Sequence, residues 1–225
     1  MIAIKRIRDF LIDVIYPEEA VCLVCGAVVQ SGCVCNQCRA ELRREDTDVW
    51  KYRNLDGVPA FSLRAHRGPA RALVLALKHQ ADACAANELA ALLHPIPGLL
   101  TLTPETVVTW VTMPARRRRE RGIDHGKLLA EAFARELGFP CHQLLTRRDD
   151  RSQTQASLAR QDRQANLRSS YAPKTGIDFP VLLVDDVLTT GTTALRCVDA
   201  LQRGGAKDIT VITATYAIGK KHTIK

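Results

Sequence analysis

The stretch VLLVDDVLTTGTT, residues 181–193, decides the fold of this chain. Its first four residues are apolar and predict a fully buried strand of a parallel sheet. Two acids, Asp185 and Asp186, follow directly, and a turn of small residues around Gly191 comes next. Apolar residues then recur at helical spacing as far as Arg203. This order places polar groups at the carboxyl end of a strand, where open α/β sheets bind their ligands.

The turn after the two acids has the composition of an anion site. Threonine and glycine let backbone N–H groups converge on a phosphate, and the N-terminus of the following helix adds a positive dipole end. Adjacent carboxylates would repel a phosphate that they faced, but they can accept hydrogen bonds from sugar hydroxyls or hold a cation beside it. A ribose 5-phosphate meets both conditions. The alternative is a merely polar turn, which would leave two charges unused at the end of a buried strand at a high cost.

Residues 181–193 resemble the phosphoribosyl pyrophosphate (PRPP) signature of type I phosphoribosyltransferases in the apolar strand, the acid pair and the Thr-Thr-Gly core. The resemblance implies that PRPP or a related phosphoribosyl ligand binds here, with Mg2+ bridging its pyrophosphate and ribose oxygens. The residues assigned to this ligand are Asp185, Asp186, Val187, Leu188, Thr189, Thr190, Gly191, Thr192 and Thr193.

Length and composition indicate a folded chain with an anionic partner. At 225 residues, 46% of them hydrophobic, the chain can form one substantial domain and a small appendage. No apolar stretch approaches the length needed to cross a bilayer, and the first 17 residues predict an amphipathic helix rather than a signal peptide. We therefore expect a cytoplasmic protein without membrane insertion. The formal net charge of +8 suggests a nucleotide, nucleic acid or pyrophosphate as partner.

The cysteines are concentrated near the N-terminus. Five of the eight fall between residues 22 and 38, and two C-x2-C pairs among them predict a structural Zn2+ site with no open coordination position. The expected ligands are Cys22, Cys25, Cys35 and Cys38, and Cys33 is a spare thiol that could replace Cys35. A redox or disulfide cluster is the alternative, and it is less expected in a cytosolic protein. The remaining cysteines, expected to be small core residues, are Cys84, Cys141 and Cys197.

We expect two units within an α/β architecture. Residues 1–50 would form an N-terminal helix and a zinc-binding knuckle, and residues 51–225 a type I phosphoribosyltransferase fold with a mainly parallel sheet flanked by helices on both faces. The polar stretch 45–59 is expected to link them, and the polar residues 146–164 predict a mobile loop. The predicted strands are 61–63, 107–112, 181–184 and 209–214, and the predicted helices are 36–44, 70–78, one ending at 93, and 124–137 closed by Gly138.

A basic run follows the predicted strand at residues 107–112. Strand-to-helix junctions of a parallel sheet open on one edge, so the run is expected on the same edge as Asp185 and Asp186. One or two of its guanidinium groups could bind pyrophosphate oxygens bidentately, and others could hold a nucleic-acid backbone. The alternative for any one arginine is a solvated surface. The residues assigned to nucleic-acid binding are Arg116, Arg117, Arg118 and Arg119.

Further segments resemble the ComF family of bacterial phosphoribosyltransferase-like proteins. They are the stretch from Pro114 to Gly122, a spaced set of residues from Gln155 to Asn166, the pair Leu77-Lys78 and the four-cysteine knuckle, in the family's order along most of the chain. Where the family tends to show Arg-Gly-Phe-Asn-Gln, this chain has Arg-Gly-Ile-Asp-His at residues 121–125. We expect His125 to be a surface residue of the helix that follows.

The resemblance implies a phosphoribosyl transfer. The two carboxylates would stabilise the positive charge that develops on the sugar, while Lys78 and Arg121 would stabilise the leaving pyrophosphate. A flexible loop that carries Gln155, Arg163 and Asn166 would close over the site to exclude water. The expected catalytic residues are Asp185, Asp186, Lys78, Arg121 and Arg163.

The ComF resemblance also implies a role in natural competence, with uptake of DNA and processing of single-stranded DNA beside a helicase-like competence protein. No segment indicates which acceptor would receive a phosphoribosyl group. The alternative is a non-catalytic module that senses PRPP or a nucleotide and binds single-stranded DNA or a helicase partner. Aromatic residues, at 5%, are sparse for base stacking. An amidophosphoribosyl activity is less expected, because the sequence shows no glutamine-hydrolysing domain.

Overall fold

The computed structural model describes residues 20–44, 51–80, 82–93, 102–114, 118–119, 122–147 and 170–218. Several sequence predictions lie outside these residues. They are the N-terminal helix, most of the loop at 146–164, and the residues Arg116, Arg117, Arg121, Gln155, Arg163 and Asn166.

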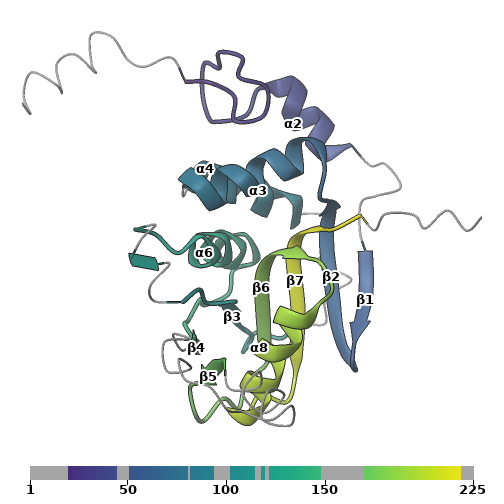
Figure 1. Cartoon of the computed structure of the whole chain (residues 1–225), viewed down its shortest axis with the longest axis vertical. Coiled ribbons are helices and arrows are strands. Elements are labelled where there is room, and N and C mark those ends of the chain that lie inside the picture. The colour runs from purple at the N-terminus through teal and green to yellow at the C-terminus, as the bar shows by residue number, and fades with distance from the viewer. Residues whose placement is uncertain are drawn as a thin grey trace, which may run out of the picture.

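A five-stranded sheet forms the centre of the structure (Figure 1). Its strands are β1 (Lys51–Leu55), β2 (Val58–Ala65), β3 (Val107–Trp110), β6 (Val181–Leu188) and β7 (Ile209–Tyr216), in the order β1-β2-β7-β6-β3. All neighbours are parallel except β1, which runs antiparallel to β2. A separate antiparallel pair is formed by β4 (Leu145–Arg147) and β5 (Tyr171–Pro173). The mainly parallel sheet expected for a type I phosphoribosyltransferase fold is confirmed.

Helices cover both faces of this sheet, as predicted. They are α2 (Asn36–Arg43), α3 (Gly68–Gln80), α4 (Ala83–Ala90) with the short 3-10 helix η1 (Ala91–Leu93), α6 (His125–Leu137) and α8 (Thr192–Arg203). The core on one face joins α3, α4 and α6 to Leu182 and Val184 of β6. The core on the other face joins α8 to Val181 and Leu183. Alternate residues of β6 therefore face opposite cores, as the pleat of a strand requires.

Helix α6 shows how local sequence sets these elements. Asp124 caps its N-terminus, because its Oδ1 accepts hydrogen bonds from the backbone N–H groups of Gly126 at 3.1 Å and Lys127 at 3.3 Å. Gly138 ends the helix in the left-handed conformation, with φ of 76°. The predicted helix bounds are confirmed, and the capping role explains the acid at position 124.

The prediction that residues 45–59 form a linker is partly wrong. Its second half forms β1 and the turn into β2, in which Asp56 and Gly57 both have positive φ, 49° and 91°. A two-residue Asp-Gly turn of this kind joins the strands of a tight hairpin. The strand was missed because β1 lies at the sheet edge, and its exposed residues lack the apolar alternation of a half-buried strand.

The cysteine knuckle packs onto the main domain rather than standing apart. Cys22, Val34 and Leu42 share one buried core with residues of α3, α4 and α6. Cys33 is bonded to Cys84 of α4 across a separation of 51 residues. The prediction of a spare thiol at Cys33 is therefore wrong, and Cys84, predicted as a small core residue, is the partner of Cys33. Cys197 is fully buried, as predicted, and Cys141 is partly buried. The boundary between units near residue 50 stays a prediction.

No helix in the described part of the chain combines the length and the apolar character that a membrane crossing requires.

Candidate functional site

The N-terminus of α8 lies at the turn between β6 and α8. Gly191, the N-cap residue, has a left-handed conformation with φ of 86° and no side chain to cap the helix. The hydroxyl of Thr190 lies 2.9 Å from that of Thr192 and accepts a long hydrogen bond, 3.4 Å, from the backbone N–H of Thr192. A helix N-terminus directs backbone N–H groups and a positive dipole end outward, so this turn has the properties of a phosphate site.

Strand β1 holds this turn in place. A guanidinium nitrogen of Arg53 donates to the backbone carbonyl of Thr189 at 2.7 Å. A Cβ atom on Gly191 would lie 2.8 Å from Cδ2 of Leu55, so glycine permits a close approach as well as the positive φ. Sequence reasoning missed both β1 residues, and the Asp-Gly turn after them was the signal that could have indicated the strand.

Replacing Gly191 by alanine tests this packing. We expect the Gly191→Ala variant to lower the free energy of unfolding by about 1 to 3 kcal/mol, because a left-handed non-glycine residue is strained and its Cβ would meet Leu55. Gly138→Ala is the matched control, since Gly138 has φ of 76° but an added Cβ there would meet nothing within 4 Å. Urea unfolding of the two variants measures the difference. Equal losses would contradict a tight contact between the turn and Leu55.

Asp186 is the most strongly paired carboxylate of the site. One of its oxygens lies 3.0 Å from Nζ of Lys78 on α3, and the other lies 3.2 Å from Nε2 of His125 on α6. Asp186 is buried, with 7% of its surface exposed. Burial raises the pKa of its carboxyl group, but the hydrogen bond from His125 and the charge of Lys78 outweigh burial and hold the pKa below its ordinary value. Asp186 therefore stays charged at neutral pH.

His125 corrects a sequence prediction. It was expected at the surface of α6, but its ring faces Asp186 and its Nδ1 is buried without a hydrogen-bond partner among the described residues. The first turn of α6 points toward the carboxyl end of β6, so the residue that follows the Asp124 cap reaches the acid. Only the packing of α6 against β6 shows this contact.

Asp185 faces the opposite side of the sheet from Asp186. It accepts a hydrogen bond from the backbone N–H of Asp186 at 2.9 Å. Its charge acts on Cys197 of α8 and Tyr171 of β5, whose pKa values burial and Asp185 both raise. Burial, followed by the charge of Asp186, raises the pKa of Asp185 to about 7. Both acids lie inside β6, which continues beyond them to Leu188.

The two carboxylates therefore have separate roles at neutral pH. Asp186 is charged and paired with Lys78 and His125. Asp185 has a pKa of about 7, and among the described residues no cation lies within ion-pair distance of it. The two carboxylates lie in different surroundings because β6 includes both residues, and successive side chains of a strand point to opposite faces of the sheet.

The predicted basic run is only partly described. Arg118 and Arg119 are exposed, and Arg118 lines a cavity of about 540 Å3 with Trp110, Lys127 and other residues at the β3 side of the sheet. The structure pairs Lys78 with Asp186, and the predicted role of Lys78 toward pyrophosphate stays a prediction. The roles assigned to Arg116, Arg117, Arg118, Arg119 and Arg121 stay predictions.

The four predicted zinc ligands come together. The sulfur atoms of Cys22, Cys25, Cys35 and Cys38 all lie within 4.8 Å of one another. The sulfurs of Cys25 and Cys35 are 3.8 Å apart, and four thiolates bound to Zn2+ at about 2.3 Å in a tetrahedron would be about 3.8 Å apart. Because Cys33 is bonded to Cys84, the geometry favours Cys35 as the fourth ligand.

Backbone groups prepare one of these thiols for a metal. Burial raises the pKa of Cys22, but backbone N–H groups, chiefly that of Cys35 at 3.3 Å from the sulfur, lower it to about 6. Burial raises the pKa of Cys38. A thiolate at Cys22 suits a cation that binds deprotonated sulfur.

Comparisons with known proteins agree with this geometry. Residues 124–225 match the phosphoribosyl transferase domain family. The chain is 31% identical to Competence protein F of Haemophilus influenzae, over 48% of each chain. It is 32% identical to Competence protein ComFC of Streptococcus pneumoniae, over 41% of this chain and 40% of that protein. A third relative is the DNA utilization protein YhgH of Salmonella typhi, 29% identical over 48% of each chain. The chain is thus similar to proteins named for competence and DNA utilization, as the ComF resemblance implied.

The matched regions are partial, and the chain spans about half the length of the curated relatives it matches. Among solved structures, a glutamine PRPP amidotransferase from B. subtilis is similar with a TM-score of 0.40 and 18% identity, covering 79% of this chain and 30% of that chain. An adenine phosphoribosyltransferase from Leishmania donovani has a TM-score of 0.38 and 14% identity, covering 78% and 94%. The fold assignment of this chain rests on its domain match and its strand order.

Proposed function

We propose that this chain is a ComF-family protein that binds PRPP together with Mg2+ at the turn between β6 and α8. The observation that carries the proposal is a helix N-terminus with glycine as its cap residue, directly after a strand that holds a buried, cation-paired carboxylate. The match to the phosphoribosyl transferase domain supports it. In this proposal the 5-phosphate accepts hydrogen bonds from the turn at residues 188–193, a ribose hydroxyl donates to Asp186, and Asp185 acts from the opposite face of β6 through its charge.

The proposed chemistry is transfer of the phosphoribosyl group. The bond between the anomeric carbon and pyrophosphate breaks, pyrophosphate leaves with the electron pair, and an acceptor supplies the pair for the new bond. Mg2+ would neutralise charge on the pyrophosphate when bound with PRPP. Asp186 would stabilise the positive charge on the sugar, and Lys78, with the predicted Arg121 and Arg163, would stabilise the leaving group. The loop residues Gln155 and Asn166 are proposed to help exclude water.

The proposed cellular role is DNA uptake in natural competence. The printed names of the relatives, competence proteins and DNA utilization proteins, support this role. Single-stranded DNA and a helicase-like competence protein are the proposed partners, with Arg116, Arg117, Arg118 and Arg119 as the proposed contacts to the strand. We also propose that Cys22, Cys25, Cys35 and Cys38 bind one structural Zn2+.

One observation favours a second function, a non-catalytic module that senses PRPP or a nucleotide. Asp186 already accepts contacts from both Lys78 and His125 within the protein. A ribose hydroxyl must therefore compete with two internal partners for this carboxylate, which suits reversible binding better than turnover.

Calorimetry and a pyrophosphate assay test the proposal in order. Titration of the full chain with PRPP in magnesium buffer is expected to show saturable binding of one ligand per chain, and no heat of binding would contradict the PRPP site. Pyrophosphate release that depends on an added nucleobase, amine or DNA end would support the transferase. Binding without any release would support the sensing module.

The pH dependence of PRPP binding tests the role of Asp185. Burial and the charge of Asp186 raise the pKa of Asp185 to about 7, so it carries a proton below that pH and is charged above it. A charged Asp185 would attract the Mg2+ that binds with PRPP, and a protonated Asp185 would not. We therefore expect PRPP affinity to rise about tenfold from pH 6 to pH 8 through this group. Asp185→Asn is expected to remove this part of the pH dependence and leave only that of PRPP itself. An unchanged profile in the variant would contradict the assignment.

A further inference from the structure

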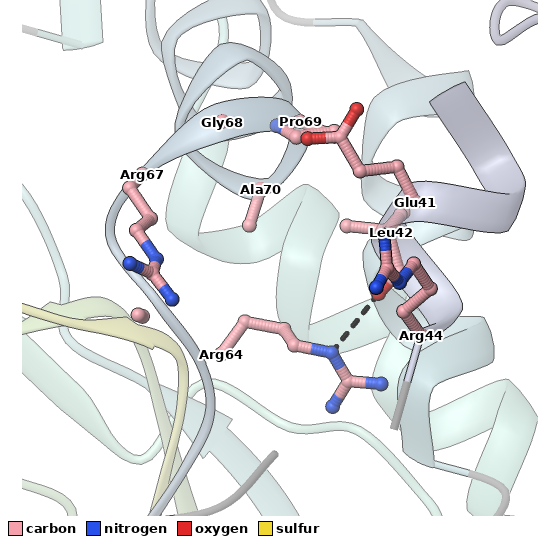
Figure 2. Close-up of a pocket in the computed structure, with 9 residues that line it drawn as sticks. Glu41, Leu42, Arg44, Arg64, Arg67, Gly68, Pro69 and Ala70 are labelled. Atoms are coloured by element: carbon pink, nitrogen blue, oxygen red, sulfur yellow. Dashed lines mark hydrogen bonds between the residues drawn. The ribbon is translucent and has the colours of Figure 1, made fainter. Parts of the chain in front are cut away.

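A second cavity lies at the junction of the cysteine knuckle and the main domain (Figure 2). It has a volume of about 390 Å3 and lies between the end of α2, the end of β2 and the start of α3. None of its residues belongs to the turn between β6 and α8. We call it the junction pocket, and it is lined by Glu41, Leu42, Arg44, Arg64, Ala65, Arg67, Gly68, Pro69 and Ala70.

Among the described residues that line the junction pocket, basic side chains outnumber acidic ones. They are the three arginines Arg44, Arg64 and Arg67 and the acid Glu41. Arg64 is held in position because its Nε donates to the carbonyl of Leu42 at 3.0 Å and a terminal nitrogen donates to the carbonyl of Leu63 at 2.8 Å. Figure 2 shows the Arg64 side chain extended across the pocket toward the end of α2. A guanidinium held in place loses little conformational entropy when it binds an anion.

The protein itself places an anion at this pocket. The pocket includes the N-terminus of the 13-residue helix α3, which has no acid in its first turn. The Glu41 carboxylate comes from α2, and its Oε1 would lie 3.4 Å from a Cβ atom built on Gly68. Figure 2 shows the Glu41 side chain directed toward Gly68 and Pro69. A negative group is therefore already accommodated beside the positive end of α3.

The junction pocket and the acid pair share one edge of the sheet. Ala65, which lines the pocket, ends β2, and the next residue, His66, bonds Thr215 of β7 through Nδ1 at 2.9 Å. Burial lowers the pKa of His66, the charges of Lys78 and Arg71 lower it further, and Asp186 acts to raise it. The charges of Lys78 and Asp186 therefore act on His66, and the residue before it, Ala65, lines the junction pocket. The junction pocket and the acid pair are thus neighbouring sites at one edge of the sheet.

We propose that the junction pocket binds the phosphate group of a nucleotide, either free or within a single strand. Arginine guanidinium groups bind phosphate oxygens bidentately, and a helix N-terminus adds to that attraction. The apolar residues Leu42, Pro69 and Ala70 offer a surface for the sugar or base, and the volume admits a ligand of nucleotide size. The inference rests on the proposed function in one respect, the expectation of a nucleotide as ligand. It is otherwise independent, because no residue of the PRPP site lines the junction pocket.

Fluorescence anisotropy of a labelled oligothymidylate of about 20 nucleotides tests the proposal. Single strands lose about 0.7 from the slope of log affinity against log salt for each phosphate contact. Arg67→Gln is therefore expected to weaken binding about tenfold and to lower that slope by about 0.7. Lys207→Gln is the matched control, because it removes one exposed positive charge just before β7, at the opposite edge of the sheet. Glu41→Gln is expected to tighten binding severalfold, since it removes the competing carboxylate.

Competition identifies the source of the phosphate. Displacement of the oligonucleotide by dTMP, with the same dependence on Arg67 and Glu41, would support a free nucleotide, and resistance to dTMP would support a strand. An Arg67→Gln variant that binds like Lys207→Gln, or a Glu41→Gln variant that binds more weakly than the unaltered protein, would overturn the proposal. Zinc content and thermal unfolding of each variant show that the knuckle is intact. PRPP calorimetry on the same variants separates the two proposals, because Arg67→Gln should weaken oligonucleotide binding and leave the PRPP titration the same as in the unaltered protein. An unaltered protein that binds the oligonucleotide through Arg67 but gives no heat with PRPP would contradict the PRPP site alone.

Discussion

Replacing Asp186 by asparagine is expected to abolish measurable PRPP binding and to destabilise the fold. The variant leaves Lys78 and His125 facing a neutral amide in a site where Asp186 is buried. Removing one partner of a buried ion pair costs about 3 to 5 kcal/mol, and the lower figure applies here because 30% of the Lys78 side chain is exposed. Chemical unfolding measures the loss of stability, and calorimetry measures PRPP binding.

A double variant separates the two effects. Asp186→Asn combined with Lys78→Met removes both main charges, so it is expected to recover part of the lost free energy of unfolding without recovering PRPP binding. Recovery of PRPP affinity in the double variant would contradict a direct role for the Asp186 carboxylate. Asp185→Asn serves as the neighbouring control, because Asp185 has no such pair with a cation.

The same ion pair predicts how stability depends on pH. The pKa of Asp186 is lower in the folded protein than its ordinary value, so the folded state favours the charged form. Its contribution is fully present at neutral pH and is lost as the pH falls through the ordinary value toward the lowered one. Unfolding measured down an acid series should show this loss in the unaltered protein and not in Asp186→Asn.

Loss of zinc is the second large effect that we expect. Structural zinc sites in small domains have apparent binding free energies of the order of 10 kcal/mol, and metal binding and folding of the knuckle are coupled. Chelation, or Cys38→Ser, should remove one zinc per chain and lower the thermal stability of the core that Val34 and Leu42 share with α3 and α4. Atomic absorption and thermal unfolding measure the two changes.

Single serine substitutions decide which cysteine is the fourth ligand. Cys35→Ser should release zinc, because its sulfur lies within the four-cysteine cluster. Cys33→Ser should retain one zinc per chain and lose only the bond to Cys84. A Cys33→Ser variant without metal, beside a Cys35→Ser variant with metal, would reverse the assignment.

Local sequence predicted the elements whose signals lie within a few residues. The buried strand, the turn around Gly191 and helix α8 follow from residues 181–203, and the Asp124 cap and Gly138 stop set the bounds of α6. The two C-x2-C pairs predicted the cluster that the structure contains. Strand β1 was missed because an edge strand needs no apolar alternation, and its role in holding Thr189 depends on the sheet.

Contacts between distant segments required the folded structure. Cys33 and Cys84 have no sequence pattern that pairs them, because a disulfide depends on the distance between Cα atoms, 6.1 Å here, and not on spacing along the chain. The separation of Asp185 from Asp186 depends on β6 continuing to Leu188, which adjacent acids in the sequence did not indicate.

The amino-acid sequence by itself determined the type of fold, the small-residue turn proposed to bind an anion and the set of cysteines proposed to bind zinc, since periodicity, turn residues and ligand spacing are local properties. Only the tertiary structure shows which groups surround each carboxylate and that the cysteine knuckle packs against α3, α4 and α6. Packing of α3 and α6 against one face of β6 brings Lys78 and His125 to Asp186, while the opposite face leaves Asp185 with a pKa near neutrality. Burial and charge at a single atom depend on elements far apart in the chain, and the free energy that shifts a pKa comes from those neighbours.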